Sequence, residues 1–100
     1  MDINIKKKLP EITKLFKQYG AEQAFLFGSA ALDQMNSKSD VDFLFQFPKN
    51  MDYVLYADNY FGLLYDLQDL LKLEVDLLAI ETLSNPYLIQ KIDSQKIQIV

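Results

Sequence analysis

The 100-residue sequence contains no cysteine, histidine, arginine or tryptophan. Without cysteine or histidine it cannot form disulfides, zinc sites built on thiolates or imidazoles, or Ser-His-Asp and Cys-His nucleophilic sites. Without arginine it cannot hold a phosphate through a bidentate guanidinium group, which leaves lysine, backbone N–H groups and metal ions to handle anions. Catalysis by this chain would therefore depend on carboxylates, hydroxyls, lysine or a bound metal.

Long hydrophobic runs and basic clusters are also scarce. The longest apolar runs span only a few residues, and Met1-Asp2-Ile3-Asn4 lacks a signal-peptide pattern, so we expect no membrane span and a cytoplasmic protein. The formal net charge of −4 argues against general nucleic-acid binding, because neutralising phosphates requires clustered basic residues. The run Lys6-Lys7-Lys8 fits a solvated helix face better than a nucleic-acid patch.

Glycine and proline number only three each, and the chain contains no linker, repeat or low-complexity tract. Half of the residues are hydrophobic, which is enough for one modest core. We therefore expect residues 1–100 to form one domain.

Helical and strand-like patterns alternate along this domain. Helical spacing and end signals predict helices near residues 5–19, 30–32 and 52–71, and from Pro86 to about Lys91. Short apolar or alternating segments predict strands at residues 24–27, 40–47, 73–80 and 96–100. The expected fold class is α/β (α+β), with a small mixed sheet of three to four strands and helices packed on it.

The predicted helix near residues 52–71 is rich in apolar and aromatic side chains. Its aromatic residues could belong to the core and its rim or form a surface for a partner protein. Apolar residues at helical spacing within it are Val54, Ala57, Phe61, Leu64, Leu67 and Leu71.

The strand predicted at residues 40–47 carries acidic residues on one face only. Because side chains alternate along a strand, Asp40 and Asp42 share a face with Leu44, while the opposite face is apolar and must meet a core. Asp76 lies in the middle of the next predicted strand, where a carboxylate is equally unusual. We expect these acids on the exposed side of the sheet.

A Gly28-Ser29 turn precedes the acidic strand by a fixed spacing: ten residues separate Ser29 from Asp40. A Gly-Ser turn lets the backbone approach a triphosphate and supplies amide and hydroxyl donors. Two aspartates at i and i+2 on one strand face can hold one or two Mg²⁺ ions, which stabilise the attacking and leaving oxygens of a phosphoryl transfer. The pattern predicts a site for a nucleoside triphosphate with Mg²⁺.

These residues resemble the G-S-x₁₀-D-x-D signature of the minimal nucleotidyltransferases in the polymerase-beta-like superfamily. The resemblance extends from the strand before Gly28 to Val75-Asp76-Leu77-Leu78, and it implies the nucleotidyltransferase fold. It also implies transfer of a nucleoside monophosphate, AMP from ATP, to an acceptor hydroxyl. In that reading Gly28 and Ser29 hold the triphosphate, and Asp40 and Asp42 ligate Mg²⁺. Asp76 ligates metal or takes the acceptor proton.

The small size is similar to that of MntA-type antitoxins of HEPN/MNT pairs, which implies a HEPN-type toxin as the protein partner. Family members commonly read Gly-Ser-Arg-Ala-Arg-Gly, whereas this chain continues from Ser29 with Ala30-Ala31-Leu32-Asp33. Lys38 is the basic residue nearest to Asp40 in the sequence and is the expected substitute cation.

Two other functions remain open. The changed residues after Ser29 fit a non-catalytic, antitoxin-like binding module that retains a degenerate nucleotide site. A hydrolytic phosphoesterase could use the same carboxylates, although such enzymes generally assemble more ligands, often including histidine.

Overall fold

A four-stranded mixed sheet organises the computed structural model, which describes residues 1–36 and 38–100. The sheet order is β3-β2-β1-β4, with β2 antiparallel to β1 and parallel to β3, and β4 antiparallel to β1. The parallel pair is joined through helix α4, the long connection that parallel strands require. The strands are β1 (Gln23–Phe27), β2 (Val41–Gln46), β3 (Val75–Ala79) and β4 (Ile97–Gln98). The predicted fold class is confirmed, and the last strand does join the sheet.

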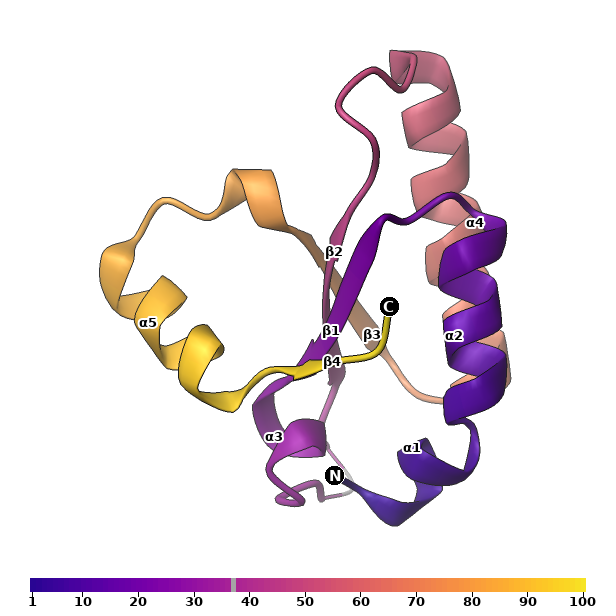
Figure 1. The fold of residues 1–100 in the computed structure, drawn as a ribbon. Helices are drawn as coiled ribbons and strands as arrows, with labels where there is room; N and C mark the ends of the chain where they lie inside the picture. The colour runs from indigo at the N-terminus through magenta and orange to yellow at the C-terminus, as the bar shows by residue number, and fades with distance from the viewer. Residues whose placement is uncertain (37) are drawn as a thin grey trace.

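The helices lie on both sides of this sheet (Figure 1). α2 and α4 cover one face, and α5 lies against the other. The helices are α1 (Ile3–Lys7), α2 (Leu9–Gln18), α3 (Gly28–Ala31), α4 (Tyr53–Leu71) and α5 (Pro86–Gln95), with one 3₁₀ turn at Ile80–Thr82. No helix of the described residues is both long enough and apolar enough to span a lipid bilayer.

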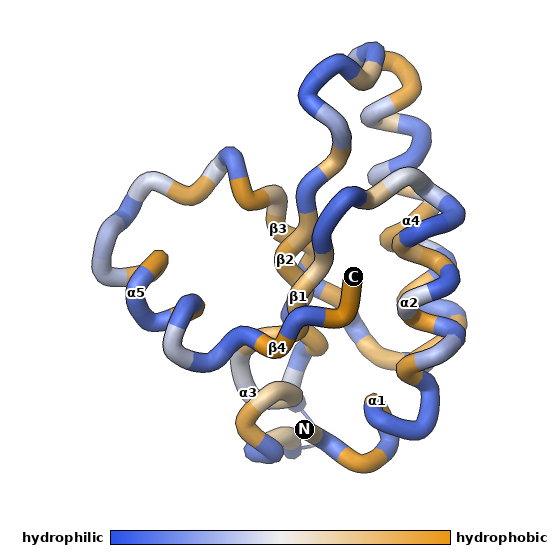
Figure 2. Tube along the Cα trace, viewed as in Figure 1, coloured by the Kyte–Doolittle hydropathy of each residue, from blue (hydrophilic) through white to orange (hydrophobic). Residues whose placement is uncertain are grey.

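The main core forms between β2 and the helices α2 and α4. Phe16 of α2 meets Phe43 of β2 edge to face, with ring centroids 5.3 Å apart. Figure 2 shows hydrophobic residues gathered along the central strands, whereas α2 and α5 alternate between hydrophobic and hydrophilic residues. The predicted apolar face of β2 is confirmed, since its side chains are all buried in this core: Val41, Phe43, Phe45 and Phe47.

A smaller cluster on the opposite face seats α5. Phe25, Leu44 and Ile92 are buried there, so this side of the sheet is partly covered. We expected this face, which carries the acids, to be exposed, but α5 covers part of it. The reason is that Leu44, which shares the face with Asp42, needs an apolar partner.

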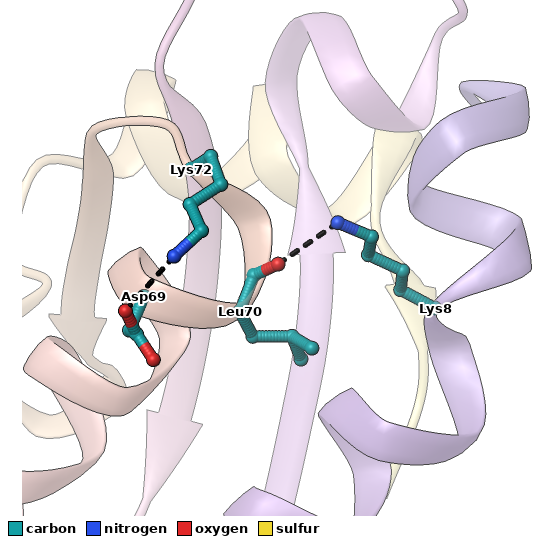
Figure 3. A network of polar contacts seen from close by, with 4 residues as sticks. All are labelled: Lys8, Asp69, Leu70 and Lys72. Carbon is teal, nitrogen blue, oxygen red and sulfur yellow. Dashed lines mark hydrogen bonds and ion pairs between the residues drawn. The ribbon is translucent and has the colours of Figure 1, made fainter.

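The single helix predicted near residues 5–19 is wrong, because the structure has two helices there, α1 and α2. α1 begins at Ile3, where Asp2 caps it by accepting from the N–H groups of Asn4 and Ile5, and it breaks at Lys8 before Pro10. Lys8 is not simply solvated: its Nζ donates to the carbonyl of Leu70 at 2.8 Å near the end of α4 (Figure 3). A cation at a helix C-terminus satisfies carbonyls that have no helical partner. The last helix also runs to Gln95, beyond the predicted Lys91.

Candidate active site

The register of β1 and β2 brings Gly28 against Asp42. Phe27 pairs with Asp42 across the two strands, and Gly28 follows directly with a positive φ of 71°. A Cβ built on Gly28 would lie 2.2 Å from Oδ2 of Asp42. Glycine is thus required here twice, for its backbone conformation and for the space that the carboxylate occupies.

The parallel pairing of β2 and β3 places Asp42 opposite Asp76 in the sheet register. Partial burial, followed by the charges of Asp76 and then Asp40, raises the pKa of Asp42 to about 6. Asp40 and Asp76 are themselves exposed. The charges of Asp76 and Asp40 therefore both act on the half-buried Asp42.

The described residues contain no group of three or more acids arranged, as they stand, to enclose a metal ion. The chemistry of the donors nevertheless suits a hard divalent cation, because carboxylate oxygens are its preferred ligands. A cation would also offset the burial and the repulsion from Asp76 and Asp40 that raise the pKa of Asp42. The donor chemistry of Asp40, Asp42 and Asp76 therefore fits such an ion.

Two depressions hold the predicted site residues other than Asp76, which lines neither of them. One of about 410 Å³ is lined by Gly28, Ser29 and Asp42, together with Lys91 of α5. Another of about 430 Å³ is lined by Lys38 and Asp40, with residues around the end of α4. Lys38 therefore lies with Asp40, away from the glycine-serine turn, and Lys91 is a site candidate that the sequence interpretation missed.

The turn after Ser29 is built for packing. Ala30 and Ala31 are buried in the main core, so the short helix α3 contributes methyl groups there and no charge. Asp33 has a φ of 58°, a left-handed conformation that glycine adopts without strain and that aspartate tolerates better than most residues. The single turn of α3 is too short for a substantial helix dipole.

Known proteins with similar sequences identify the family of this chain. The family described as polymerase beta nucleotidyltransferase matches residues 10–100. The chain belongs to this nucleotidyltransferase family. A relative from Methanocaldococcus jannaschii that bears the name protein adenylyltransferase is 33% identical over 96 residues, which cover 95% of this chain and 94% of the relative. Nucleotidyltransferases generally use a divalent metal, in keeping with the acidic site.

Solved structures share the nucleotidyltransferase fold. A structure described as a minimal nucleotidyltransferase superposes with a TM-score of 0.77 and 26% identity, over 97% of this chain and 95% of that chain. An MNT antitoxin structure, solved with a tri-AMPylated Shewanella oneidensis HEPN toxin, gives a TM-score of 0.66 at 21% identity, over 95% of this chain and 71% of that chain. The sequence-based family assignment is confirmed.

Tyr60 of α4 is a second neighbour of the site that sequence reasoning did not single out. Its hydroxyl donates to the carbonyl of Leu77 at 2.9 Å, next to Asp76 in the chain. Burial and then the charge of Asp76 raise the Tyr60 pKa. Tyr60 therefore ties α4 to β3 beside the third carboxylate. No signal short of the tertiary fold distinguishes it from the other tyrosines of α4.

Proposed function

We propose that this nucleotidyltransferase transfers AMP from ATP, with Mg²⁺, to a hydroxyl group of a partner protein, and that the partner is a HEPN-type toxin. The observation that carries the proposal is the contact of the Asp42 carboxylate with Gly28, opposite Asp76 in the sheet. The name of the M. jannaschii relative and the AMPylated toxin bound to an MNT antitoxin support this substrate class. Residues 1–100 act as one domain, in the cytoplasm, where ATP is supplied.

Each residue has a role that follows from its position. Gly28 and Ser29 hold the triphosphate through backbone N–H groups and the serine hydroxyl, and the absence of a Cβ on Gly28 lets the Asp42 carboxylate lie beside that turn. Asp40 and Asp42 provide carboxylate ligands for Mg²⁺. When bound, Mg²⁺ neutralises phosphate charge and favours departure of the leaving group.

The transfer is a single displacement at the α-phosphorus of ATP. The acceptor oxygen forms a bond to that phosphorus, and the bond to the oxygen bridging the α- and β-phosphates breaks. Pyrophosphate leaves with the bond electrons. The proton of the acceptor hydroxyl goes to Asp76, or Asp76 joins Asp40 and Asp42 as a ligand and the proton passes to water.

Calorimetric titration tests the site without knowledge of the acceptor. ATP is titrated into wild-type protein with and without Mg²⁺, and into the Asp40→Asn, Asp42→Asn double variant. We expect Mg²⁺-dependent binding that the double variant loses. Asp58→Asn removes an exposed acid of α4 outside the two depressions that hold the site residues, and it should bind as wild type does. Equal binding by the double variant would rule out this site.

A non-catalytic, antitoxin-like binding module is the second candidate. The uncharged, buried Ala30 and Ala31 after the Gly-Ser turn favour it. Incubation of the protein with a purified HEPN-type toxin and ATP labelled at the α-phosphate separates the two. Label on the toxin that depends on Asp42 supports the enzyme, whereas inhibition of the toxin without label supports the binding module.

A further inference from the structure

The depression at Gly28 has a single basic side chain among the described residues that line it, and that residue is Lys91. It lies about 60 residues along the chain from Gly28 and Ser29, so only the fold brings them to one place. α3, which contains Gly28 and Ser29, contacts α5, which contains Lys91.

The face of α5 toward the depression is fixed by packing. Leu88, Lys91, Ile92 and Gln95 line it at the i, i+3, i+4 and i+7 spacing of one helix face. Ile92 is 2% exposed and packs with Phe25 and Leu44 on the sheet, so its neighbour Lys91 is held at the rim.

Both ends of α5 are also anchored. Asn85 caps the start by accepting from the N–H groups of Tyr87 and Leu88 at 2.9 and 3.3 Å. At the other end, the Nζ of Lys96 lies 4.6 Å from the ring centroid of Phe25 and 2.9 Å from Asp93. A helix fixed at its ends and centre presents Lys91 to the depression in a defined orientation.

Other lysines are committed elsewhere or lie apart. In the described part of the chain the ion pairs join Lys72 to Asp69 and Lys96 to Asp93, and neither includes Lys91. Lys38 lines the other depression. The chain has no arginine, and α3 carries no basic residue.

We propose that Lys91 binds the phosphate groups of the nucleotide held at Gly28 and Ser29. This inference rests on the proposed function, and it assigns to α5 the cation that the sequence interpretation assigned to Lys38. A lysine ammonium at this position neutralises phosphate charge beside Asp42, in a depression whose described lining contains no other cationic side chain.

Nucleotide titrations test the assignment. ATP and AMP are titrated in the presence of Mg²⁺ into wild type, Lys91→Gln, Lys91→Arg and, as an exposed control on α2, Lys17→Gln. We expect Lys91→Gln to weaken ATP binding about tenfold and AMP binding much less, because AMP lacks the outer phosphates. Lys91→Arg should keep ATP affinity within about threefold, and Lys17→Gln should match wild type.

Acylation of lysines in the wild-type protein provides a measurement that needs no variant. The reaction with an amine-selective reagent is followed at each lysine by peptide mass spectrometry, with and without ATP and Mg²⁺. Lys91 should be protected by ATP and not by adenosine, while Lys17 should react equally in both conditions.

The two proposals fail in different ways. Absence of ATP binding by wild type overturns both. Wild-type binding that Lys91→Gln retains in full overturns the role of Lys91 and leaves the nucleotide site in place. A larger loss of ATP affinity in Lys38→Gln than in Lys91→Gln also overturns it, and returns the role to the lysine beside Asp40.

Discussion

The hydrogen on Gly28 occupies a position where any side chain would meet the carboxylate of Asp42. Gly28→Ala must place a Cβ 2.2 Å from Oδ2 of Asp42 and hold a positive φ of 71°. We expect a loss of about 2 kcal/mol in the free energy of unfolding, from strained backbone and a displaced carboxylate. In an Asp42→Ala background the same change should cost only about 1 kcal/mol, because the clash is gone. Urea denaturation of the four proteins measures the difference, and equal costs in both backgrounds would contradict the contact.

Asp42 itself should destabilise the metal-free fold above its pKa. The folded-state pKa of about 6 exceeds the unfolded value near 4, so the folded state alone keeps the proton between these values and stability falls as pH rises through that window. Asp42→Asn removes this penalty. We expect no gain below about pH 4 and a gain of about 1 kcal/mol above about pH 7, after discounting for the solvent that reaches the carboxyl.

Thermal or urea denaturation across this pH range measures the gain, with Asp58→Asn as the exposed comparison. A gain that is constant with pH would argue for a packing effect. Addition of Mg²⁺ and ATP should reverse the order of stability, because a ligand that binds only the folded wild type stabilises it by mass action.

Local sequence predicted Asp42 and Asp76 as site residues because a carboxylate inside a strand pattern needs an explanation. The spacing between the Gly28-Ser29 turn and Asp40 added the other members, and Lys38 was chosen as the nearest cation. The sheet register places Asp42 opposite Asp76. Lys91 could not be found in the same way. A lysine on an amphipathic helix has an ordinary solvent-facing explanation, and only the tertiary packing of Ile92 shows which way that helix turns.

Among the elements, α4 shows the limit of periodicity most clearly. The predicted stripe holds only toward the end of the helix: Leu67 and Leu71 are buried as expected, together with Leu63, which lies outside the stripe. Toward the start of the helix the stripe fails, since Val54 is 70% exposed and Phe61 is 51% exposed. Because α4 is apolar on much of its circumference, several faces satisfy a helical period equally well. In a strand each side chain points to one of only two faces, so the buried faces of β2 and β3 could be predicted correctly from alternation.

Gly62 lies within α4, where glycine weakens a helix, yet Tyr19 explains it. A Cβ on Gly62 would lie 2.7 Å from Cε1 of the Tyr19 ring, whose hydroxyl donates to Asp66. Gly62→Ala should therefore destabilise by about 1 kcal/mol, despite a helix-propensity gain of similar size. In a Tyr19→Ala background the same substitution should become stabilising. Chemical denaturation reports both values, and a stabilising Gly62→Ala in wild type would mean that the ring moves away freely.

At the scale of the whole molecule, the C-terminal strand returns to the sheet beside β1 (Figure 1). The carbonyl of Ala24 accepts from the N–H groups of Ile99 and Val100, and Thr13 donates to the carbonyl of Ile99. Removal of residues 97–100 deletes these bonds and three apolar side chains packed on the main core. We expect a loss of about 2–4 kcal/mol, and a melting temperature lower by 10 °C or more for a domain of about this size.

Circular dichroism on heating measures this loss. Gln98→Ala changes an exposed side chain of the same strand and should alter stability by about 0.5 kcal/mol or less. A truncated protein that melts with wild type would show that β4 is dispensable to the sheet.

The pairing of β2 with β3 also sets the order in which the protein acquires its chemistry. Asp42 and Asp76 lie opposite each other only when β3 is paired with β2, and β3 is an edge strand held on one side by β2. During synthesis the Gly-Ser turn and the first two acids therefore leave the ribosome well before the third can join them. Partial opening of β3 in the mature protein would separate Asp76 from Asp42 while the pairing of β1 with β2 stays intact. We therefore expect the amides of β3 to exchange their hydrogens at a lower temperature than those of β1 and β2. Activity should be lost over the same lower temperature range, before the whole protein unfolds.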